Sequence, residues 1–341
     1  MNISHSYPGY DESVVEAAYE SLKIAGFSGL AMKDKAENCL ATFVGADWVL
    51  LTGSGYAAVQ TALVAADVKP GQQIAIPTVT CPSLFHAIRS IGAIPLVVDV
   101  CRQQPLISSQ IIDGLEFNGI VIIPQMFGIK QQLKPFAKNG RVIIEDAAQA
   151  FAPETDEFAD ITVFSFSPTK LITIGYGGAI ATQSQELHDR GRLFLDPDHS
   201  AHVDNDNENV DFRLHSPVSD FQSAMLIAQL KRYHKAVAYR WKIVSYYDYY
   251  LNNSHRLKPQ VPFRYQLILP QANSRNVSGA LRTKGINAWS LGSQLIHEVF
   301  NIKGDFSEAE KWRNKILSLP LHEGLNENHV AQICKVVNNY L

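Results

Sequence analysis

Short runs of branched apolar residues recur through the first half of the chain, and stretches with helical character separate them. These runs are WVLLT, QIAIP, PLVVDV, IVIIP, RVIIED, DITVFSF and GAIATQ, between residues 48 and 183. Runs of this length between turn residues are typical of buried strands, and their alternation with helices is typical of βαβ units. The sequence therefore predicts an α/β fold with a mostly parallel seven-stranded sheet between helices.

The helical stretches follow the same alternation. Residues 56–67 and 82–93 have the pattern of helices, and we expect one helix before IVIIP and another before RVIIED. Residues 220–250 read as one long helix, and from about residue 256 a strand-like RYQLILP mixes with helical segments. We therefore predict a large domain over residues 1–245, including the N-terminal segment, and a smaller C-terminal α+β domain over residues 246–341.

Composition limits the class of partner. Apolar residues make up 46% of the 341 residues, and the formal net charge is −3, so we expect a large core and neither nucleic acid nor an anionic membrane as a partner. No apolar run approaches the ~20 residues of a membrane helix, and the acidic residues 196–211 are expected to form a solvated loop. The N-terminus lacks the apolar core of a signal peptide, and the four cysteines are scattered without metal-site spacing. We expect a cytoplasmic protein without a metal site.

One strand end carries a Gly-Ser-Gly turn. In parallel sheets ligands gather at the carboxyl ends of the strands, so the residues after each strand are candidates for a site. After WVLLT, Gly53, Ser54 and Gly55 lead into a helix, whose free N–H groups and dipole favour an anion such as a phosphate. Packing alone is the alternative explanation for glycines at such a turn.

Two further strand ends carry a carboxylate and an amine. Asp146 follows RVIIE, where it could cap a helix or hold a buried cation. Lys170 follows ITVF. It could simply be exposed to solvent, because a lysine buried at the end of an apolar sheet is costly unless it is paired with an anion or neutral. An anion cradle, a carboxylate and a lysine at one sheet edge are what pyridoxal 5'-phosphate (PLP) needs for its phosphate, its ring nitrogen and its aldehyde.

At these positions the sequence resembles the DegT/DnrJ/EryC1/StrS sugar aminotransferases, which belong to the fold-type I PLP-dependent enzymes. The likeness runs from about residue 28 almost to the end of the chain. The segments that carry it are GSGYAAVQTALVAADVKPG, IEDAAQAFAPE, ADITVFSFSPTKLITIGYGG, SDFQSAMLIAQLKR, LRTKGINAWSLGSQLIH and LSLPLHEGL. The resemblance implies a fold-type I transferase, PLP as the cofactor, and a homodimer with the active site at its interface.

The resemblance also assigns roles to single residues. Lys170 would be the Schiff-base lysine, Asp146 the partner of the pyridinium nitrogen, and Gln149 the residue that contacts the ring hydroxyl. Because related sugar dehydratases carry histidine at the lysine position, Lys170 favours transamination. The phosphate would be held by Ser54, Gly55, Tyr56 and Ser165.

Three residues of this cofactor set differ from the family pattern. Tyr56 stands where the family usually has a threonine whose hydroxyl contacts the phosphate. Cys81 stands where the family often stacks an aromatic ring on the cofactor. Asp211 stands where an asparagine reaches the phosphate of the neighbouring subunit, and a carboxylate there would be repelled unless it is protonated or turned away.

The resemblance implies a reaction and its substrates. An amino acid, by likeness L-glutamate, would pass its amino group to a nucleotide-linked keto-sugar, for surface polysaccharides or the amino sugars of secondary metabolites. Tyr176, Arg213 and His297 are candidate substrate contacts, although each could also serve only in packing or ion pairing. Three alternatives remain open: another acceptor with the same cofactor, a dehydratase, and a non-catalytic regulator that keeps the fold. A dinucleotide-binding turn fits less well, because the third glycine is missing.

Overall fold

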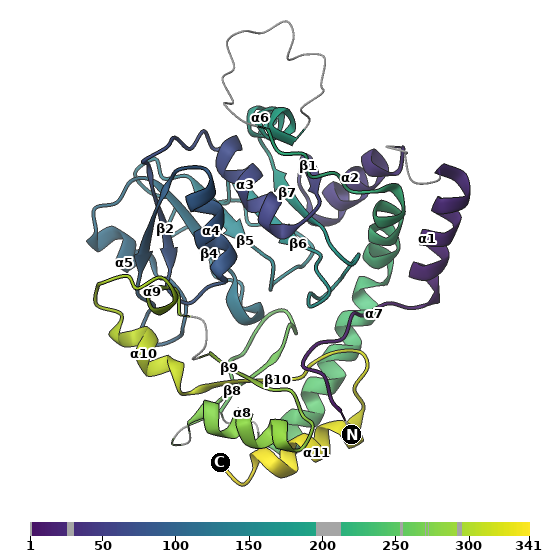
Figure 1. Ribbon diagram of the computed structural model, residues 1–341, viewed down its shortest axis with the longest axis vertical. Coiled ribbons are helices and arrows are strands. Elements are labelled where there is room, and N and C mark those ends of the chain that lie inside the picture. Colours follow the sequence, from purple (N-terminus) through teal and green to yellow (C-terminus); the bar gives the residue numbers. More distant parts are fainter. Residues whose placement is uncertain are drawn as a thin grey trace, which may run out of the picture.

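The seven predicted strands form one sheet in the order β1-β7-β6-β5-β4-β2-β3 (Figure 1). The computed structural model describes residues 2–25, 31–195, 213–252, 255–269, 271, 273–291 and 295–341. The strands are β1 (Trp48–Thr52), β2 (Gln73–Pro77), β3 (Ile94–Val98), β4 (Ile120–Pro124), β5 (Ile143–Asp146), β6 (Ile161–Ser165) and β7 (Gly178–Thr182). The predicted seven-stranded sheet is therefore confirmed.

Strand direction decides which residues share an edge of this sheet. The pairs β2–β3, β2–β4, β4–β5 and β5–β6 are parallel, whereas β7 is antiparallel to both of its neighbours, β1 and β6. Every strand except β7 therefore points the same way. The carboxyl ends of β1, β2, β5 and β6, which carry the predicted site residues, lie along one edge.

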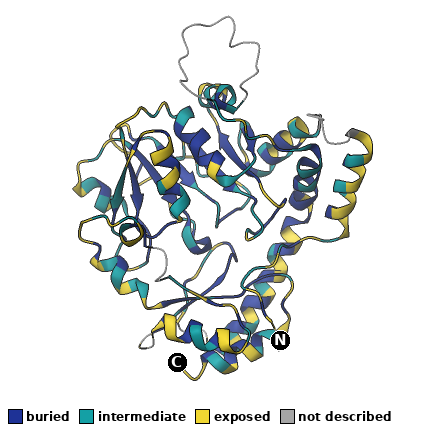
Figure 2. Cartoon of the chain, viewed as in Figure 1, coloured by how far each residue is buried: buried dark blue, intermediate teal, exposed yellow. Residues whose placement is uncertain are grey.

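Helices cover both faces of the sheet, and alternating side chains decide which helices each face contacts. Leu50 and Ile180 pack in a cluster with residues of α3 and α4, whereas Val49 and Leu51 pack in a cluster with residues of α2 and α7. Figure 2 shows the buried residues concentrated on the strands and on the inner sides of the helices. The helices around the sheet are α1 (Glu12–Ala25), α2 (Ala31–Val44), α3 (Gly55–Ala65), α4 (Pro82–Ser90), α5 (Ser109–Gly114), α6 (Gln185–Leu195) and α7 (Asp220–Tyr250).

A second, three-stranded sheet is formed by the C-terminal part of the chain. Its strand order is β8-β10-β9 and both pairings are antiparallel. The elements are β8 (Tyr265–Ile268), α8 (Ser274–Thr283), β9 (Trp289–Ser290), α9 (Ile296–Val299), α10 (Ser307–Arg313), β10 (Ile316–Leu319) and α11 (Glu327–Val337). The chain's N-terminal residues lie beside this part, because Ile3 forms a β-bridge with Ile286 (Figure 1).

Helix α7 links the two sheets, and its predicted span over residues 220–250 is confirmed. Leu226 and Leu230 pack in the cluster of the large sheet, whereas Val244 and Tyr247 pack in the cluster of the small one. The predicted domain boundary after residue 245 falls within this helix and stays a prediction. Within the described ranges, no helix has both the length and the apolar character needed to cross a lipid bilayer.

The prediction of a helix between IVIIP and RVIIED is wrong. Only a 3-10 turn, Met126–Gly128, and irregular chain lie between β4 and β5. Phe127 has φ 65° and Gly128 has φ 80°, and two successive residues in this region cannot continue a right-handed helix. A Cβ at Gly128 would lie 2.1 Å from the carbonyl oxygen of Val261, so a contact with a distant segment shapes this turn.

Candidate active site

The Gly-Ser-Gly turn begins helix α3 at the predicted sheet edge. Ser54 is the N-cap of α3, and its Oγ accepts a hydrogen bond from the N–H of Ala57 at 3.1 Å. The hydroxyl of Thr52, the last residue of β1, donates to the carbonyl oxygen of Ser54 at 2.9 Å. The N–H of Gly53 donates to the carbonyl oxygen of Ser216 at 2.9 Å. These bonds hold the turn, so that the N-terminus of α3 has a defined position.

The start of α3 lies against the end of β6. A Cβ added to Gly55 would lie 2.7 Å from the Cβ of Ser165 and 2.8 Å from its Oγ. The absence of a side chain at Gly55 therefore lets Ser165 pack directly against the backbone there, and the Ser165 hydroxyl lies beside the helix N-terminus. A hydroxyl next to free backbone N–H groups is a donor set that suits a phosphate.

Asp146 ends β5, between the strands that carry the other candidates. Its Oδ1 accepts a hydrogen bond from the N–H of Ala148 at 3.0 Å. Burial raises the pKa of this carboxyl, while the bond from Ala148 and the charge of Lys170 oppose the shift. The carboxyl of Asp146 and the amine of Lys170 are thus close enough to interact electrostatically.

Lys170 is half-buried near this carboxyl. Burial lowers the pKa of its amine, against the opposing effects of Asp146 and Cys81. Its Nζ lies 5.7 Å from the centre of the Phe263 ring, and its backbone N–H donates to the carbonyl oxygen of Ser167 at 3.0 Å. An amine with a lowered pKa is more often neutral, which is the form that acts as a nucleophile or a base.

The turn, the carboxyl and the amine thus gather along one edge of the sheet. Residues 11–338 of the chain match the sequence model of the DegT/DnrJ/EryC1/StrS aminotransferase family. The chain belongs to this family. The resemblance drawn from the sequence is therefore confirmed.

Two curated relatives of this aminotransferase differ in what they act on. The present chain is 24% identical over 324 residues to a UDP-2-acetamido-2-deoxy-3-oxo-D-glucuronate aminotransferase of Pseudomonas aeruginosa, with 89% of each chain covered. It is 25% identical over 228 residues to a 3-oxo-glucose-6-phosphate:glutamate aminotransferase of Bacillus subtilis, covering 64% of this chain and 52% of that one. Among solved structures, Spr1654 of Streptococcus pneumoniae in its PLP form has a TM-score of 0.89 at 20% identity, with 100% of each chain covered. The structural likeness establishes the fold.

Two further predicted cofactor contacts of the aminotransferase lie near this edge. Cys81 is exposed at the N-cap of α4, where its Sγ accepts a hydrogen bond from the Ser83 hydroxyl at 3.0 Å, and it lies near enough to Lys170 to influence the pKa of that amine. The Oε1 of Gln149 accepts a hydrogen bond from the N–H of Phe127 at 2.9 Å. This bond fixes the orientation of the Gln149 amide, whose Nε2 is left to donate.

The remaining predicted residues have different surroundings. Tyr56 and Tyr176 are exposed, and the carbonyl oxygen of Tyr176 accepts from Gln222 Nε2 at 2.8 Å. Arg213 donates from Nη1 to the carbonyl oxygen of Leu193, at the end of α6, at 2.9 Å. Asp211 lies outside the described residues. The roles of these residues stay predictions.

The His297 side chain lies between the end of β2 and helix α10. Its Nδ1 lies 2.6 Å from the hydroxyl oxygen of Thr78, just after β2, and its Nε2 lies 3.1 Å from Glu310 Oε1. The ligand atoms of His297, Glu298 and Glu310 are close enough together to hold a metal ion. However, Arg313 forms ion pairs with both carboxylates, so a cation already neutralises them. The predicted substrate contact of His297 stays a prediction.

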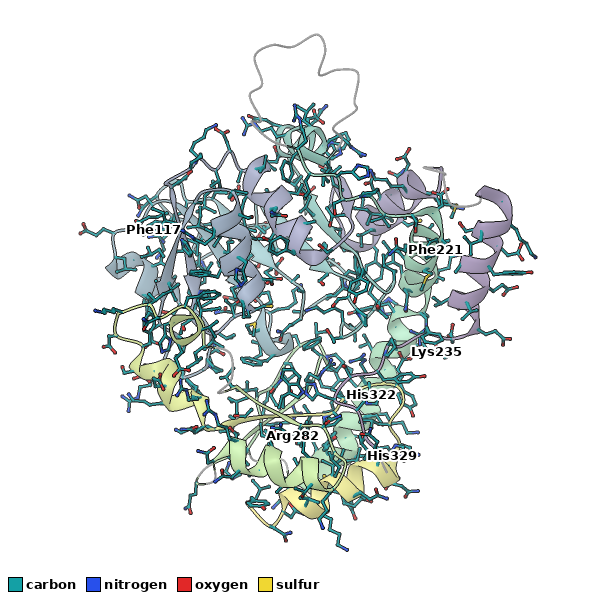
Figure 3. The ribbon with its side chains drawn as sticks, in the orientation of Figure 1. Phe117, Phe221, Lys235, Arg282, His322 and His329 are labelled. Atoms are coloured by element: carbon teal, nitrogen blue, oxygen red, sulfur yellow. The ribbon has the colours of Figure 1, made fainter. Side chains whose placement is uncertain are left out.

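Sequence reasoning missed Arg264, which contacts the segment that carries Lys170. Its Nη2 donates to the carbonyl oxygen of Thr169, the residue before Lys170, at 2.7 Å. Its charge also contributes to the lowered pKa of His322, which Figure 3 labels in the C-terminal part of the molecule, beside α7. The available signal was an arginine inside the apolar run VPFRYQLIL, where a buried charge needs a reason.

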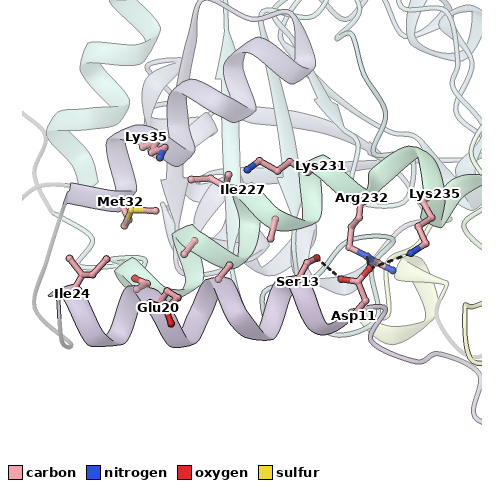
Figure 4. A pocket seen from close by; sticks show the side chains of 14 residues that line it. Asp11, Ser13, Glu20, Ile24, Met32, Lys35, Ile227, Lys231, Arg232 and Lys235 are labelled. Carbon is pink, nitrogen blue, oxygen red and sulfur yellow. Dashed lines mark hydrogen bonds and ion pairs between the residues drawn. The ribbon is translucent and has the colours of Figure 1, made fainter.

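A cavity of about 770 Å³ lies elsewhere, between α1 and α7 (Figure 4). Ile24, Met32 and Ile227 contribute apolar surface to it, and Asp11 forms an ion pair with Arg232 at one end. None of the predicted site residues lines this cavity. It is separate from the candidate active site.

Proposed function

We propose that this protein is a PLP-dependent aminotransferase that moves an amino group from L-glutamate to a nucleotide-linked keto-sugar. The observation that carries the proposal is the meeting of three groups at one sheet edge: the amine of Lys170, the carboxyl of Asp146, and the cradle between Gly55 and Ser165. Membership of the aminotransferase family supports it.

The residues present fit the proposed cofactor. When bound, PLP supplies an aldehyde that reacts with amines and a ring that takes up electrons. Lys170 would hold the aldehyde carbon, and Asp146 would hold a proton on the ring nitrogen. Ser165 and the first N–H groups of α3, which Gly55 allows to lie close together, would bind the phosphate. Gln149 would donate from Nε2 to the ring hydroxyl.

Lys170 also has the properties of the proton-transfer group. Once displaced by the donor, its neutral amine would take a proton from the donor's α-carbon as a general base, and would then give that proton to the former aldehyde carbon of the cofactor as a general acid. Burial lowers the pKa of Lys170, which increases the neutral fraction that this role needs. Burial raises the pKa of Asp146, so a positive charge beside the carboxyl, such as a protonated ring nitrogen, would favour its ionised form.

The substrates are proposed from the relatives. A UDP-linked 3-oxo sugar is named for the Pseudomonas aeruginosa enzyme, and glutamate is named for the Bacillus subtilis one. Surface polysaccharide or secondary-metabolite biosynthesis would use the aminated product. A cytoplasmic homodimer with a shared active site, and the domains 1–245 and 246–341, complete the proposal. In that dimer, Tyr176, Arg213 and His297 would contact the substrate. Asp211 would lie near the phosphate of the cofactor in the partner subunit, with its carboxyl protonated or turned away.

The decisive experiment separates the two half-reactions. Purified protein loaded with PLP is mixed with L-glutamate, and we expect about one equivalent of 2-oxoglutarate per subunit in the absence of an acceptor. Nucleotide-linked keto-sugars are then added in turn, and the expected result is continuous 2-oxoglutarate release with one of them. Protein that binds PLP but releases no 2-oxo acid from any amino acid would contradict the proposal and favour a regulator. Loss of water from a sugar without amine transfer would favour a dehydratase.

A further inference from the structure

Lys170 lies in the lysine segment, residues 166–177, which is irregular chain between β6 and β7. Within this segment the hydroxyl of Thr173 and the N–H of Ile174 both donate to the carbonyl oxygen of Phe166, at 3.0 Å and 3.2 Å. A segment that is neither helix nor strand lacks a regular series of backbone hydrogen bonds. The position of the Lys170 amine therefore depends on side chains that hold the segment from other parts of the fold.

Two such side chains hold the lysine segment on either side of Lys170. Arg264, just before β8, donates from Nη2 to the carbonyl oxygen of Thr169 at 2.7 Å. Gln229, on α7, donates from Nε2 to the carbonyl oxygen of Thr173 at 2.8 Å. Lys170 thus stands between two backbone carbonyls that are each fixed by a side chain from a distant part of the sequence.

The amide of Gln229 is fully engaged by contacts within the protein. Gln229 has no exposed surface, and its Nε2 donates to the carbonyl oxygen of Gly9 at 2.8 Å as well as to that of Thr173. Its Oε1 accepts from Arg232 Nη1 at 3.0 Å. Because an arginine only donates and a carbonyl only accepts, these partners fix which end of the amide is the oxygen. The side chain is therefore held in one orientation.

The same amide connects the lysine segment to the start of the chain. Arg232 also donates to the carbonyl oxygen of Gly9 at 3.2 Å. It forms ion pairs with Asp11, as Figure 4 shows, and with Glu323, which lies between β10 and α11. The residues before α1 are thus tied to α7 by the groups that orient Gln229, so their docking is linked to the lysine segment.

We propose that Gln229 is a positioning residue for Lys170, because its amide holds the lysine segment where the amine lies near Asp146. This inference rests on the proposed function, in which the amine moves a proton. Such a transfer needs close placement, because a displacement of about 1 Å can cost about 100-fold in rate. Gln229 itself is assigned no step of the reaction, since its amide is occupied by the contacts that hold the segment.

Gln229→Met removes the amide, keeps a side chain of similar size and adds no charge. The readout is the pKa of the Lys170 amine in full-length protein freed of PLP. Competitive acylation over a range of pH, followed by mass spectrometry of the Lys170 peptide, measures this pKa. Burial and Arg264 lower the pKa, whereas Asp146 and Cys81 raise it, so it reports where the amine lies.

We expect the pKa of Lys170 to rise by about 1 in Gln229→Met, toward the ordinary lysine value, because a released segment lets water reach the amine. Gln60→Met is the matched control, since Gln60, on α3, is 8% exposed and donates from Nε2 to the Ser90 hydroxyl. This control also loses a buried amide bond, and its Lys170 pKa should equal that of the wild type. Equal pKa values in the two variants would overturn the proposal.

Gln229→Glu gives a second test that does not depend on the folding of Gln229→Met. Its carboxylate can pair with Arg232 and keep the fold, but it offers no N–H to the carbonyls of Thr173 and Gly9. With L-glutamate and an accepted keto-sugar, kcat should fall about 10- to 100-fold while the KM for L-glutamate changes little. A kcat equal to that of Gln60→Glu would overturn the proposal, because the amide would then serve the fold alone. Wild-type protein that releases no 2-oxoglutarate would contradict the proposed function, and the lysine titration would still decide this inference.

Discussion

Gly55 lies directly against Ser165, although the two residues belong to different strand–helix units. The Cβ that an alanine would add at Gly55 comes 2.7 Å from the Cβ of Ser165, closer than side chains pack. The contact brings the N-terminus of α3 and a hydroxyl at the end of β6 to one place. The anion cradle therefore depends on the absence of a side chain at Gly55.

Gly55→Ala should damage both packing and cofactor binding. We expect a loss of about 1–3 kcal/mol in the free energy of unfolding, because a Cβ is forced into an occupied space. We also expect at least about tenfold weaker PLP binding. Gly279→Ala is the control, since this glycine lies within α8 and its Cβ would meet no atom within 4 Å. Helix propensity should make that variant more stable by about 1 kcal/mol. Denaturant titrations and PLP titrations that fail to separate the two variants would contradict this account.

Lys170→Ala should remove both covalent attachment and turnover. After borohydride reduction of PLP-loaded protein, we expect the wild type to carry a cofactor-sized mass increase on the peptide of Lys170, and the variant to carry none there. The turnover rate should fall at least about 1,000-fold, because the base that moves the proton is gone. Lys235→Ala, which removes an exposed lysine, should match the wild type in both measurements. Attachment of the cofactor at a different lysine in the wild type would remove Lys170 from its role.

Asp146→Asn should keep the cofactor and lose the chemistry. The amide can still accept from the N–H of Ala148, but it has no charge to hold a proton on the ring nitrogen. We expect PLP attachment to persist while turnover falls about 100- to 1,000-fold. Glu145→Gln is the control on the same strand, because Glu145 points to the opposite face and accepts from Gln125 and Thr162. Steady-state rates of Asp146→Asn within tenfold of Glu145→Gln would argue against the assigned role.

Acid should destabilise the protein through two buried histidines. Burial lowers the pKa of His322 to about 4 and that of His5 to about 3, from 6.5. Between the folded-state pKa of each histidine and 6.5, the unfolded chain binds more protons than the folded chain. The free energy of unfolding is therefore unaffected by these histidines above pH 6.5, and it falls as the pH drops below 6.5. The slope should approach about 1.4 kcal/mol per pH unit for each histidine.

Urea unfolding between pH 7.5 and 5 measures this slope. The N–H of Gly324 donates to His322 Nδ1, so Nε2 carries the proton and donates to the carbonyl oxygen of Ser4. His322→Gln should lower the free energy of unfolding at pH 7.5. It should also reduce the slope of that free energy against pH by the contribution of one histidine. His234→Gln, at an exposed position, should leave the dependence unchanged. An unfolding free energy that does not change between pH 7.5 and 5 would contradict the assignment.

Local pattern was sufficient to predict the strands and the edge of the sheet at which the candidate site residues lie. The apolar runs became β1 to β7 because strands buried on both faces need continuous apolar sequence. The turn at Ser54, the carboxyl of Asp146 and the amine of Lys170 lie at this edge because each stands at or within a few residues of the end of a strand, and parallel strands end at one edge. Residues 220–250 formed one helix because no glycine or proline interrupts them.

Contacts between distant segments decided the rest. No local signal places the Val261 carbonyl against Gly128, and that contact accompanies the turn that stands where a helix was predicted. The same holds for His297, which lies between Thr78 and Glu310, and for Arg264, which reaches Thr169. Periodicity in a sequence reports which residues are buried, since burial follows the repeat of a helix or strand. It does not report which partner a buried charge meets, because that partner comes from another part of the chain and is chosen only when the elements pack.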